Sequence, residues 1–256
     1  MKKLIAVAVV AMMMLGTSVS ANEWNKIRVG VEGAYPPFSW VEKDGTLKGF
    51  DIDIAMALCE EIGAECVLVP QDWDGIIPAL LARKYDAIIA SMSITEERKK
   101  KVAFSGKYYN TPAKFARKKG SGISISKAGM KGKKVGVQRA TTHDNFITAE
   151  FGDSVEIKRY GTQDEAYLEA ISGRIDLLLA DSIAMEDGFL KTDKGKGWEF
   201  VGPGYSDPKY FGVGAGIAVR KSDGELAKLF SLAIKVIRSN GVYHMINGKY
   251  FAFDVY

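Results

Sequence analysis

The sequence predicts an α/β protein of two similar lobes with a ligand-binding cleft between them. Two pairs of similar segments support this fold class. KIRVGVEGA (26–34) and KKVGVQRA (133–140) each have the pattern of a strand with Val-Gly-Val at its centre and a polar turn at its end. LLARKYDAIIAS (80–91) and EAISGRIDLLLAD (169–181) each run from a helix into an apolar strand through an aspartate. Short apolar strands between helices indicate parallel sheets that are covered on both faces.

The first 21 residues are predicted to be an export signal and not part of the fold. Lys2 and Lys3 form a positive start, residues 4–15 an apolar core, and residues 19–21 (Val-Ser-Ala) a small-residue cleavage site. No later stretch approaches the roughly 20 apolar residues that a membrane-spanning helix needs. We therefore expect a mature protein that begins at Asn22 and is released into a periplasm.

Two helices are predicted in the first half of the mature chain. The apolar stripe of the first consists of Ile52, Ala55, Met56, Cys59 and Ile62. Gly63 is suited to end this helix in the left-handed conformation. The second can begin at Asp74, because Pro78 is then still in the first turn, where proline is tolerated. We interpret the stripe as part of the core and not as a cofactor site.

Cys59 and Cys66 are the only cysteines in the chain. In an oxidising compartment, a pair at this spacing predicts a disulfide, which would tie the first helix to the next strand. The alternative is two buried thiols. The only histidines, His143 and His244, lie far from the cysteines in the sequence, so a zinc site is not supported. We expect no metal and no cofactor.

The stretch ASMSITEERKK (90–100) follows a predicted strand and brings Ser91, Ser93 and Thr95 within about one helical turn of Arg98. One interpretation is helix capping by Ser93 or Thr95. The other is an anion site, in which hydroxyls and backbone N–H groups lie beside a guanidinium that can bind a carboxylate with two hydrogen bonds. The stretch taken alone leaves both interpretations open.

Other predicted strands also end in polar residues. In a chain of βαβ units, the ligand lies at the carboxyl ends of the strands, in the crevice between lobes. The candidates at these ends are Glu32, Ser91, Ser93, Gln138, Thr141, Thr142 and Asp181. Each alone could cap the helix that follows it. Their expected convergence on one cleft favours a site for an amino-acid carboxylate, with Arg98 in one wall.

The sequence closely resembles the periplasmic amino-acid-binding proteins of polar amino acid ABC importers, in particular the lysine/arginine/ornithine-binding type. The resemblance covers residues 26–256 and rests on the order and spacing of YPPFSW, GFDIDIAMALCEEIGAEC, WDGIIPALLARKYDAIIASMSITEER, SGRIDLLLAD and NGKYFAFDVY. It implies a two-lobed type II periplasmic binding protein fold. Residues 22–110 and 212–256 would form lobe 1 and residues 111–211 lobe 2, with hinge strands near Thr111 and Gly212.

The resemblance also implies how the backbone groups of an amino acid would be bound. Arg98 is similar to the family arginine that binds the ligand α-carboxylate. Ser93 and Thr142 would add donors to the same carboxylate. Asp181, with Ser91, matches the residues that accept hydrogen bonds from the α-ammonium group.

For the ligand side chain, the resemblance implies an aromatic pair and an acidic residue. Tyr35 and Trp73 match two aromatic residues that sandwich the side chain, an arrangement that suits a guanidinium or an aliphatic stem. Glu32 lies where the lysine/arginine/ornithine-binding type carries an acidic residue for the distal cation. Asp51 is a weaker second candidate for that cation.

The predicted function is therefore that of a monomeric receptor that closes over a basic L-amino acid. Its ligand would be arginine, with lysine or ornithine also bound, and its partner the permease of an ABC transporter. Ala90 and Ala140 depart from the Ser and Gly of the best-known members, and Arg139 and His143 lie in the second-lobe loop without an assigned role. These departures leave the ligand open, and an opine-binding receptor is one alternative.

An enzyme is the alternative from another class. Periplasmic cyclohexadienyl dehydratases share this fold and some of these motifs, and their elimination reaction needs a positioned proton donor. Here Glu32 and Asp181 are each expected to face a ligand cation, which favours binding over catalysis. The basic runs lack interleaved aromatic residues, so we expect no nucleic-acid partner. A sensor role remains open beside transport.

Overall fold

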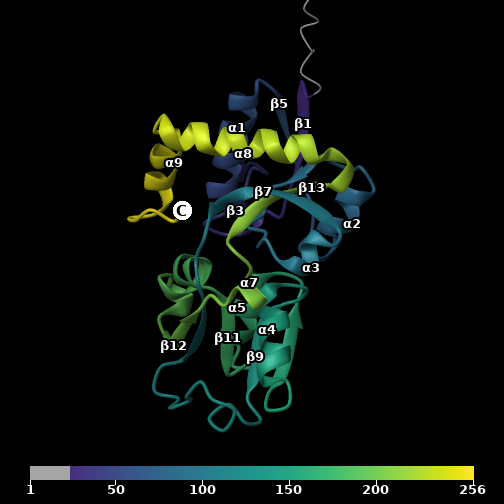
Figure 1. Ribbon diagram of the computed structural model, residues 1–256. Coiled ribbons are helices and arrows are strands. Elements are labelled where there is room, and N and C mark those ends of the chain that lie inside the picture. Colours follow the sequence, from purple (N-terminus) through teal and green to yellow (C-terminus); the bar gives the residue numbers. More distant parts are fainter. Residues whose placement is uncertain (1–23) are drawn as a thin grey trace, which may run out of the picture.

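The computed structural model describes residues 24–256, so the predicted export signal lies outside the described residues. The chain forms two lobes, and each is built around a five-stranded sheet (Figure 1). Within residues 24–256, no helix is long and apolar enough to cross a membrane. This arrangement confirms the predicted two-lobed α/β fold class.

The first sheet forms the centre of the upper lobe in Figure 1. Its strands, in spatial order, are β5 (Glu65–Pro70), β1 (Lys26–Val31), β6 (Ala87–Ile88), β13 (Ala215–Arg220) and β7 (Val102–Tyr109). The pairs of β1 with β5 and β6 are parallel, whereas β13 is antiparallel to both of its neighbours. A small antiparallel sheet adjoins this lobe and consists of β2 (Ala34–Tyr35), β3 (Ser39–Val41) and β4 (Leu47–Lys48).

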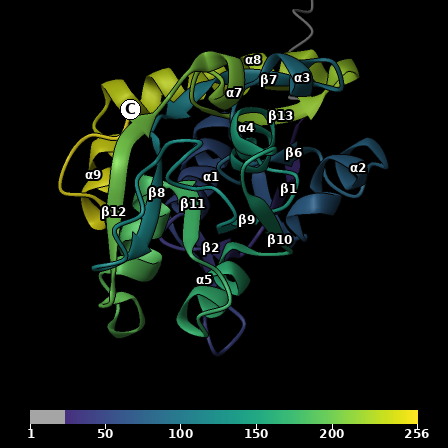
Figure 2. The same cartoon turned by 90° about the horizontal axis from the view of Figure 1, so that it is seen from below.

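The second sheet has a related order. Its strands are β10 (Glu156–Tyr160), β9 (Lys134–Gln138), β11 (Leu177–Asp181), β8 (Ala113–Lys118) and β12 (Trp198–Tyr205). Figure 2 shows these strands side by side. β8 is antiparallel to β11 and β12. The predicted parallel pairing holds for the βαβ strands of both lobes, but the sheets are mixed, because the strands next to each crossing between lobes run antiparallel to them.

Helices cover both sheets. The α-helices are α1 (Phe50–Ile62), α2 (Ile76–Leu81), α3 (Glu96–Lys99), α4 (Thr142–Phe151), α5 (Gln163–Ile171), α6 (Ser182–Met185), α7 (Pro208–Phe211), α8 (Gly224–Ser239) and α9 (Val242–Tyr250). Short 3-10 turns are η1 (Trp73–Gly75), η3 (Asp193–Gly195) and η4 (Lys221–Asp223), and η2 (Glu186–Leu190) is a π-helical turn. α4 and α5 lie on opposite sides of the second sheet (Figure 2).

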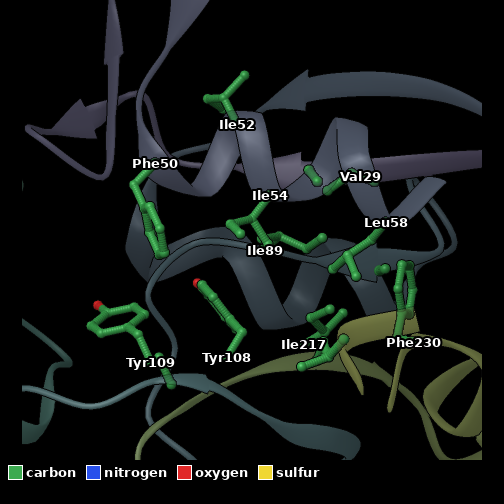
Figure 3. Close-up of a cluster of buried hydrophobic side chains, with 14 of the residues drawn as sticks. Val29, Phe50, Ile52, Ile54, Leu58, Ile89, Tyr108, Tyr109, Ile217 and Phe230 are labelled. Atoms are coloured by element: carbon green, nitrogen blue, oxygen red, sulfur yellow. The ribbon is translucent and has the colours of Figure 1, made fainter. Parts of the chain in front are cut away.

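Helix α1 shows how the first core is built. It ends at Gly63 in the left-handed conformation, as predicted, with φ 77°. Figure 3 shows Ile54 and Leu58 of this helix in the same buried cluster as Phe230 of α8. The predicted stripe is wrong at Met56, which is 48% exposed. The buried face of α1 is shifted from the predicted stripe because the helix packs against both its sheet and α8.

The predicted disulfide between Cys59 and Cys66 is not formed, and both cysteines are free. The Cys66 thiol donates to the carbonyl oxygen of Ala55, with Sγ and O 3.7 Å apart. A hydrogen bond with Cys66, together with burial, raises the pKa of the Cys59 thiol. The structure thus has the alternative arrangement, two thiols between α1 and β5 that are held by hydrogen bonds.

The chain passes between the lobes twice, at residues 110–112 and 206–214. The first segment joins β7 to β8, and the second carries α7 to β13. The backbone N–H of Asn110 in the first crossing donates to the Val255 carbonyl oxygen at 2.8 Å, so the chain end packs on the crossing. The lobe boundaries at 111 and 212 stay a prediction.

Candidate functional site

A pocket with about 620 Å³ of empty space lies between the two lobes. All of the predicted site residues except Asp51 line it, namely Glu32, Tyr35, Trp73, Ser91, Ser93, Arg98, Gln138, Thr141, Thr142 and Asp181. They come from both lobes and are separated by up to about 150 positions in the sequence. Most of them lie at or shortly after the ends of β1, β5, β6, β9 and β11, as expected for ligand sites of α/β folds.

Asp51 lies behind the pocket wall. It is fully buried at the start of α1 and accepts hydrogen bonds from the Ser91 Oγ and the Tyr108 hydroxyl, each at 2.8 Å. Burial raises the pKa of its carboxyl to about 7. Asp51 thus fixes the side chain of Ser91, a residue whose backbone has a positive φ of 52°, and does not itself face the pocket.

The stretch 90–100 contains a helix cap and also presents a guanidinium to the pocket. Thr95 Oγ1 accepts a hydrogen bond from the backbone N–H of Arg98 at 3.2 Å and so caps α3. The Arg98 guanidinium extends to the pocket, where its Nη1 donates to the Ser93 carbonyl oxygen at 3.0 Å. The capping and anion-site interpretations therefore apply to different groups of one stretch.

Arg98 has a free charge in this arrangement. Its Cζ lies 5.1 Å from the centroid of the Trp73 ring, and no acidic side chain within residues 24–256 forms an ion pair with it. Burial lowers the pKa of Arg98 to about 10, and the nearby charge of Glu97 offsets this effect only in part. A bound carboxylate would supply the missing negative charge.

The facing wall begins at the N-terminus of α4. Thr141 is the N-cap, because its Oγ1 accepts a hydrogen bond from the backbone N–H of Asp144 at 3.1 Å. Thr142 is the first helical residue and lines the pocket. The N-terminal N–H groups and the helix dipole favour an anion here. His143 beside them is neutral, because burial and the Arg98 charge lower its pKa to about 3.

Two carboxylates line the rest of the pocket. Asp181 Oδ1 accepts hydrogen bonds from the backbone N–H groups of Ile183 and Ala184, at 2.9 and 3.1 Å, and Oδ2 accepts one from the Thr111 hydroxyl. Glu32 Oε1 accepts a hydrogen bond from Gln138 Nε2 at 2.5 Å. Burial raises the pKa of Glu32 to about 7 and that of Asp181 to about 6. Neither forms an ion pair within the described residues, so a cationic ligand would stabilise both.

Aromatic rings complete the walls. Trp73 is only 8% exposed, and its Nε1 donates to the Ala140 carbonyl oxygen of the other lobe at 3.2 Å. Tyr35 is half-buried, and burial raises the pKa of its hydroxyl well above the usual range. Such rings can contact an aliphatic stem or the face of a guanidinium.

Several residues in the pocket were not predicted as site residues. Those from the two crossings and their flanking strands are Tyr109, Asn110, Thr111, Ala113, Phe211, Gly214 and Ala215. The hinge positions at 111 and 212 were the only sequence signal that could have identified them. His143, which the sequence left without a role, also lines the pocket.

The charges in the pocket determine which ligands it can hold. Among its lining residues, Arg98 is positive, His143 is neutral, and Glu32 and Asp181 are acidic. This pattern complements a molecule with one carboxylate and two cationic groups. Within residues 24–256, no cluster of His, Cys, Asp and Glu is suited to hold a metal ion.

The chain is similar to known proteins over most or all of its length. The chain is 52% identical to the L-arginine-binding protein of Pseudomonas aeruginosa, over 100% of this chain and 99% of that one. It is 40% identical to the histidine-binding periplasmic protein of Salmonella typhimurium, again over 100% and 99%. Among solved structures, it is similar to an ancestral arginine-binding protein bound to arginine, with a TM-score of 0.82, 37% identity, and 89% and 99% of the two chains covered.

These relatives are named as binding proteins, which agrees with the prediction of a binding protein and not an enzyme. The family model of the bacterial extracellular solute-binding proteins, family 3, matches residues 27–253. This match confirms the resemblance found in the sequence. The chain belongs to family 3 of the bacterial extracellular solute-binding proteins.

Proposed function

We propose that this protein binds L-arginine in the periplasm, with lysine and ornithine as further ligands, and delivers it to the permease of an ABC importer. The observation that carries the proposal is the charge pattern of the pocket: within residues 24–256, Arg98 forms no ion pair with an acidic side chain, and Glu32 and Asp181 form none with a basic one. An arginine zwitterion with its guanidinium has the opposite pattern. Each buried charge would then have a partner, which removes the cost of leaving it unpaired.

The α-carboxylate of the ligand would lie between Arg98 and the N-terminus of α4. A guanidinium can donate two parallel hydrogen bonds to a carboxylate, and Thr142 would add a donor from the other lobe. The α-ammonium would donate to Asp181. The hydroxyl of Ser91 is held in place by Asp51 beside this position.

The guanidinium of the ligand would lie against Glu32, with its stem between Tyr35 and Trp73. Removing a carboxylate from water costs several kcal/mol unless a cation compensates it, so Glu32 favours a basic side chain over a neutral one. Glutamine would leave Glu32 without a counter-charge. A basic amino acid is therefore the ligand class that the site supports best.

The relatives support the transport role and the ligand class. They include an L-arginine-binding protein and a histidine-binding periplasmic protein, and the similar solved structure holds arginine. Together with the export signal predicted from the sequence, they favour a periplasmic receptor. The lobes would act as two rigid bodies that the ligand holds in the closed state.

Isothermal titration calorimetry tests the ligand directly. The panel consists of arginine, lysine, ornithine, histidine, glutamine and the opine octopine. We expect binding of arginine, followed by lysine and ornithine, with weak or no binding of glutamine. Tight binding of glutamine without binding of any basic amino acid would contradict the proposal. Tighter binding of histidine or octopine than of arginine would mean that this compound, and not arginine, is the main ligand.

A further inference from the structure

Asp74 and Arg139 lie at the mouth of the cleft, on opposite lobes. Arg139 Nε donates to Asp74 Oδ2 at 2.5 Å, and the two side chains are 51% and 38% exposed. Asp74 is in the turn η1 of the first lobe, and Arg139 directly follows β9 of the second. Neither residue lines the ligand pocket. The ion pair thus joins the lobes from outside the set of residues that line the pocket.

The backbone on both sides of this pair is fixed. The N–H of Arg139 donates to the Tyr160 carbonyl oxygen at 2.9 Å, and the N–H of Ala140 donates to Asp144 Oδ2 at 3.2 Å. On the other lobe, the N–H of Gly75 donates to the Asp72 carbonyl oxygen at 3.1 Å. Both charges are therefore presented by ordered turns, so their approach depends on the distance between the lobes.

The sequence neighbours of the pair also meet across the cleft. Trp73 contacts Ala140 through the 3.2 Å hydrogen bond, and Gln138 contacts Glu32 at 2.5 Å. Trp73 and Gln138 line the pocket. Asp74 and Arg139 are their sequence neighbours and add a contact between the lobes outside the pocket. Opening the lobes would separate all of these contacts together.

We propose that Asp74 and Arg139 form a latch that raises ligand affinity from outside the site by favouring the closed lobes. A contact present only in the closed state raises the population of that state, and the apparent Kd is inversely proportional to the fraction of protein in the binding-competent state. Because the pair is half-exposed, its contribution is that of a surface ion pair. We expect its loss to raise Kd about two- to fivefold.

The latch should act on release more than on capture. Its contact forms after the ligand has entered, so removing it should raise koff about two- to fivefold and leave kon within about twofold. The test uses the full mature protein with Asp74→Asn, Arg139→Gln, both changes together, and the exchanged pair Asp74→Arg with Arg139→Asp. Stopped-flow fluorescence gives kon and koff for L-arginine.

A matched control is available in the second lobe. Arg174 Nη2 lies 2.5 Å from Glu169 Oε1, so this pair has the same chemistry and a similar exposure but does not join the lobes. Arg174→Gln should leave kon and koff unchanged. We expect the same increase in koff for arginine in both single variants, Asp74→Asn and Arg139→Gln, and in the double variant. The exchanged pair should restore the koff of the wild type.

The latch is overturned if koff of the single variants equals that of the wild type. It is also overturned if the increase in koff of the double variant equals the product of the two single-variant increases, because the two residues would then act independently. It is also overturned if Arg174→Gln accelerates release equally. The proposal rests on the proposed function only for the choice of probe. If the wild-type protein does not bind arginine, the proposed function fails. The latch is then tested by measuring kon and koff of the same variants with the amino acid that calorimetry identifies.

Discussion

The two lobes have sheets of related strand order but differ in the polar residues at the ends of their strands. Each has a glycine in the second strand of its sheet, β1 or β9, and in each lobe a side chain two residues before the adjacent parallel strand, β6 or β11, occupies the space beside that glycine. A Cβ at Gly30 would lie 2.5 Å from the Tyr85 ring, and one at Gly136 would lie 2.4 Å from Ile175 Cδ1. The Val-Gly-Val repeat in the sequence thus reflects the same close packing in both lobes.

At the strand ends the lobes differ. The first lobe contributes Arg98 and Glu32, neither of which forms an ion pair within the described residues. In the second lobe, Thr141 caps α4, while Asp181 caps α6 and accepts from Thr111. The polar groups of the second lobe therefore help to fold their own lobe. We infer that the first lobe determines most of the ligand affinity and that the second lobe closes the other side of the pocket.

The largest expected effect is that of Arg98→Lys. Lysine keeps the charge but cannot donate two parallel hydrogen bonds to a carboxylate. A charge-assisted hydrogen bond contributes about 1.5–3 kcal/mol, so affinity for arginine should fall on the order of tenfold to a hundredfold in calorimetry. The melting temperature without ligand should hardly change. Lys100→Arg, an exposed change in the same segment, is the control, and an affinity of Arg98→Lys within about twofold of wild type would place the carboxylate elsewhere.

Glu32→Gln tests the other charged end of the first lobe. The substitution removes the counter-charge of the ligand guanidinium while keeping a polar side chain of similar size. Affinity for arginine and lysine should fall about tenfold, whereas affinity for glutamine should stay the same or rise. Glu60→Gln on the exposed side of α1 should have no effect. An equal loss of affinity for arginine and glutamine would show that Glu32 does not distinguish between ligand side chains.

The pH dependence follows from the raised pKa values of about 7 for Glu32 and about 6 for Asp181. Both carboxylates must lose protons to bind a cation, so affinity for arginine should fall about tenfold or more between pH 8 and pH 5. Stability without ligand should change in the opposite direction. Because only the native state still holds these protons between about pH 4 and pH 7, the free energy of unfolding should decrease as the pH rises through that range.

Calorimetry in buffers of different ionisation enthalpy checks the proton release that accompanies arginine binding near pH 6.5. Glu32→Gln should remove the part of this release that belongs to Glu32. His143 contributes nothing in this range, because its pKa is lowered to about 3. Binding without proton release at pH 6.5 would mean that both carboxylates are already ionised in the free protein.

The sequence was sufficient for the frame and for most of the pocket. Strand-end residues such as Glu32 and Asp181 could be predicted because parallel strands of one sheet bring their carboxyl ends to one edge. Residues at the crossings, such as Asn110 and Phe211, could not, because their position depends on how the two lobes are joined. Asp51 was expected, as a weaker second candidate, beside the distal cation of the ligand, but at the start of α1 its carboxylate accepts a hydrogen bond from Ser91.

The smallest expected effect separates two adjacent residues of the second lobe. Thr141 caps α4, so Thr141→Ala should destabilise the protein by about 1 kcal/mol with or without ligand. Thr142 lines the pocket, and Thr142→Val keeps its shape while removing a hydroxyl. Loss of one neutral hydrogen bond, about 0.5–1.5 kcal/mol, should weaken arginine binding two- to tenfold. Thermal unfolding without ligand and calorimetry with arginine distinguish these roles. If Thr142→Val bound arginine as tightly as wild type, the second lobe would hold the carboxylate through backbone N–H groups alone, and the contrast between the lobes would be sharper still.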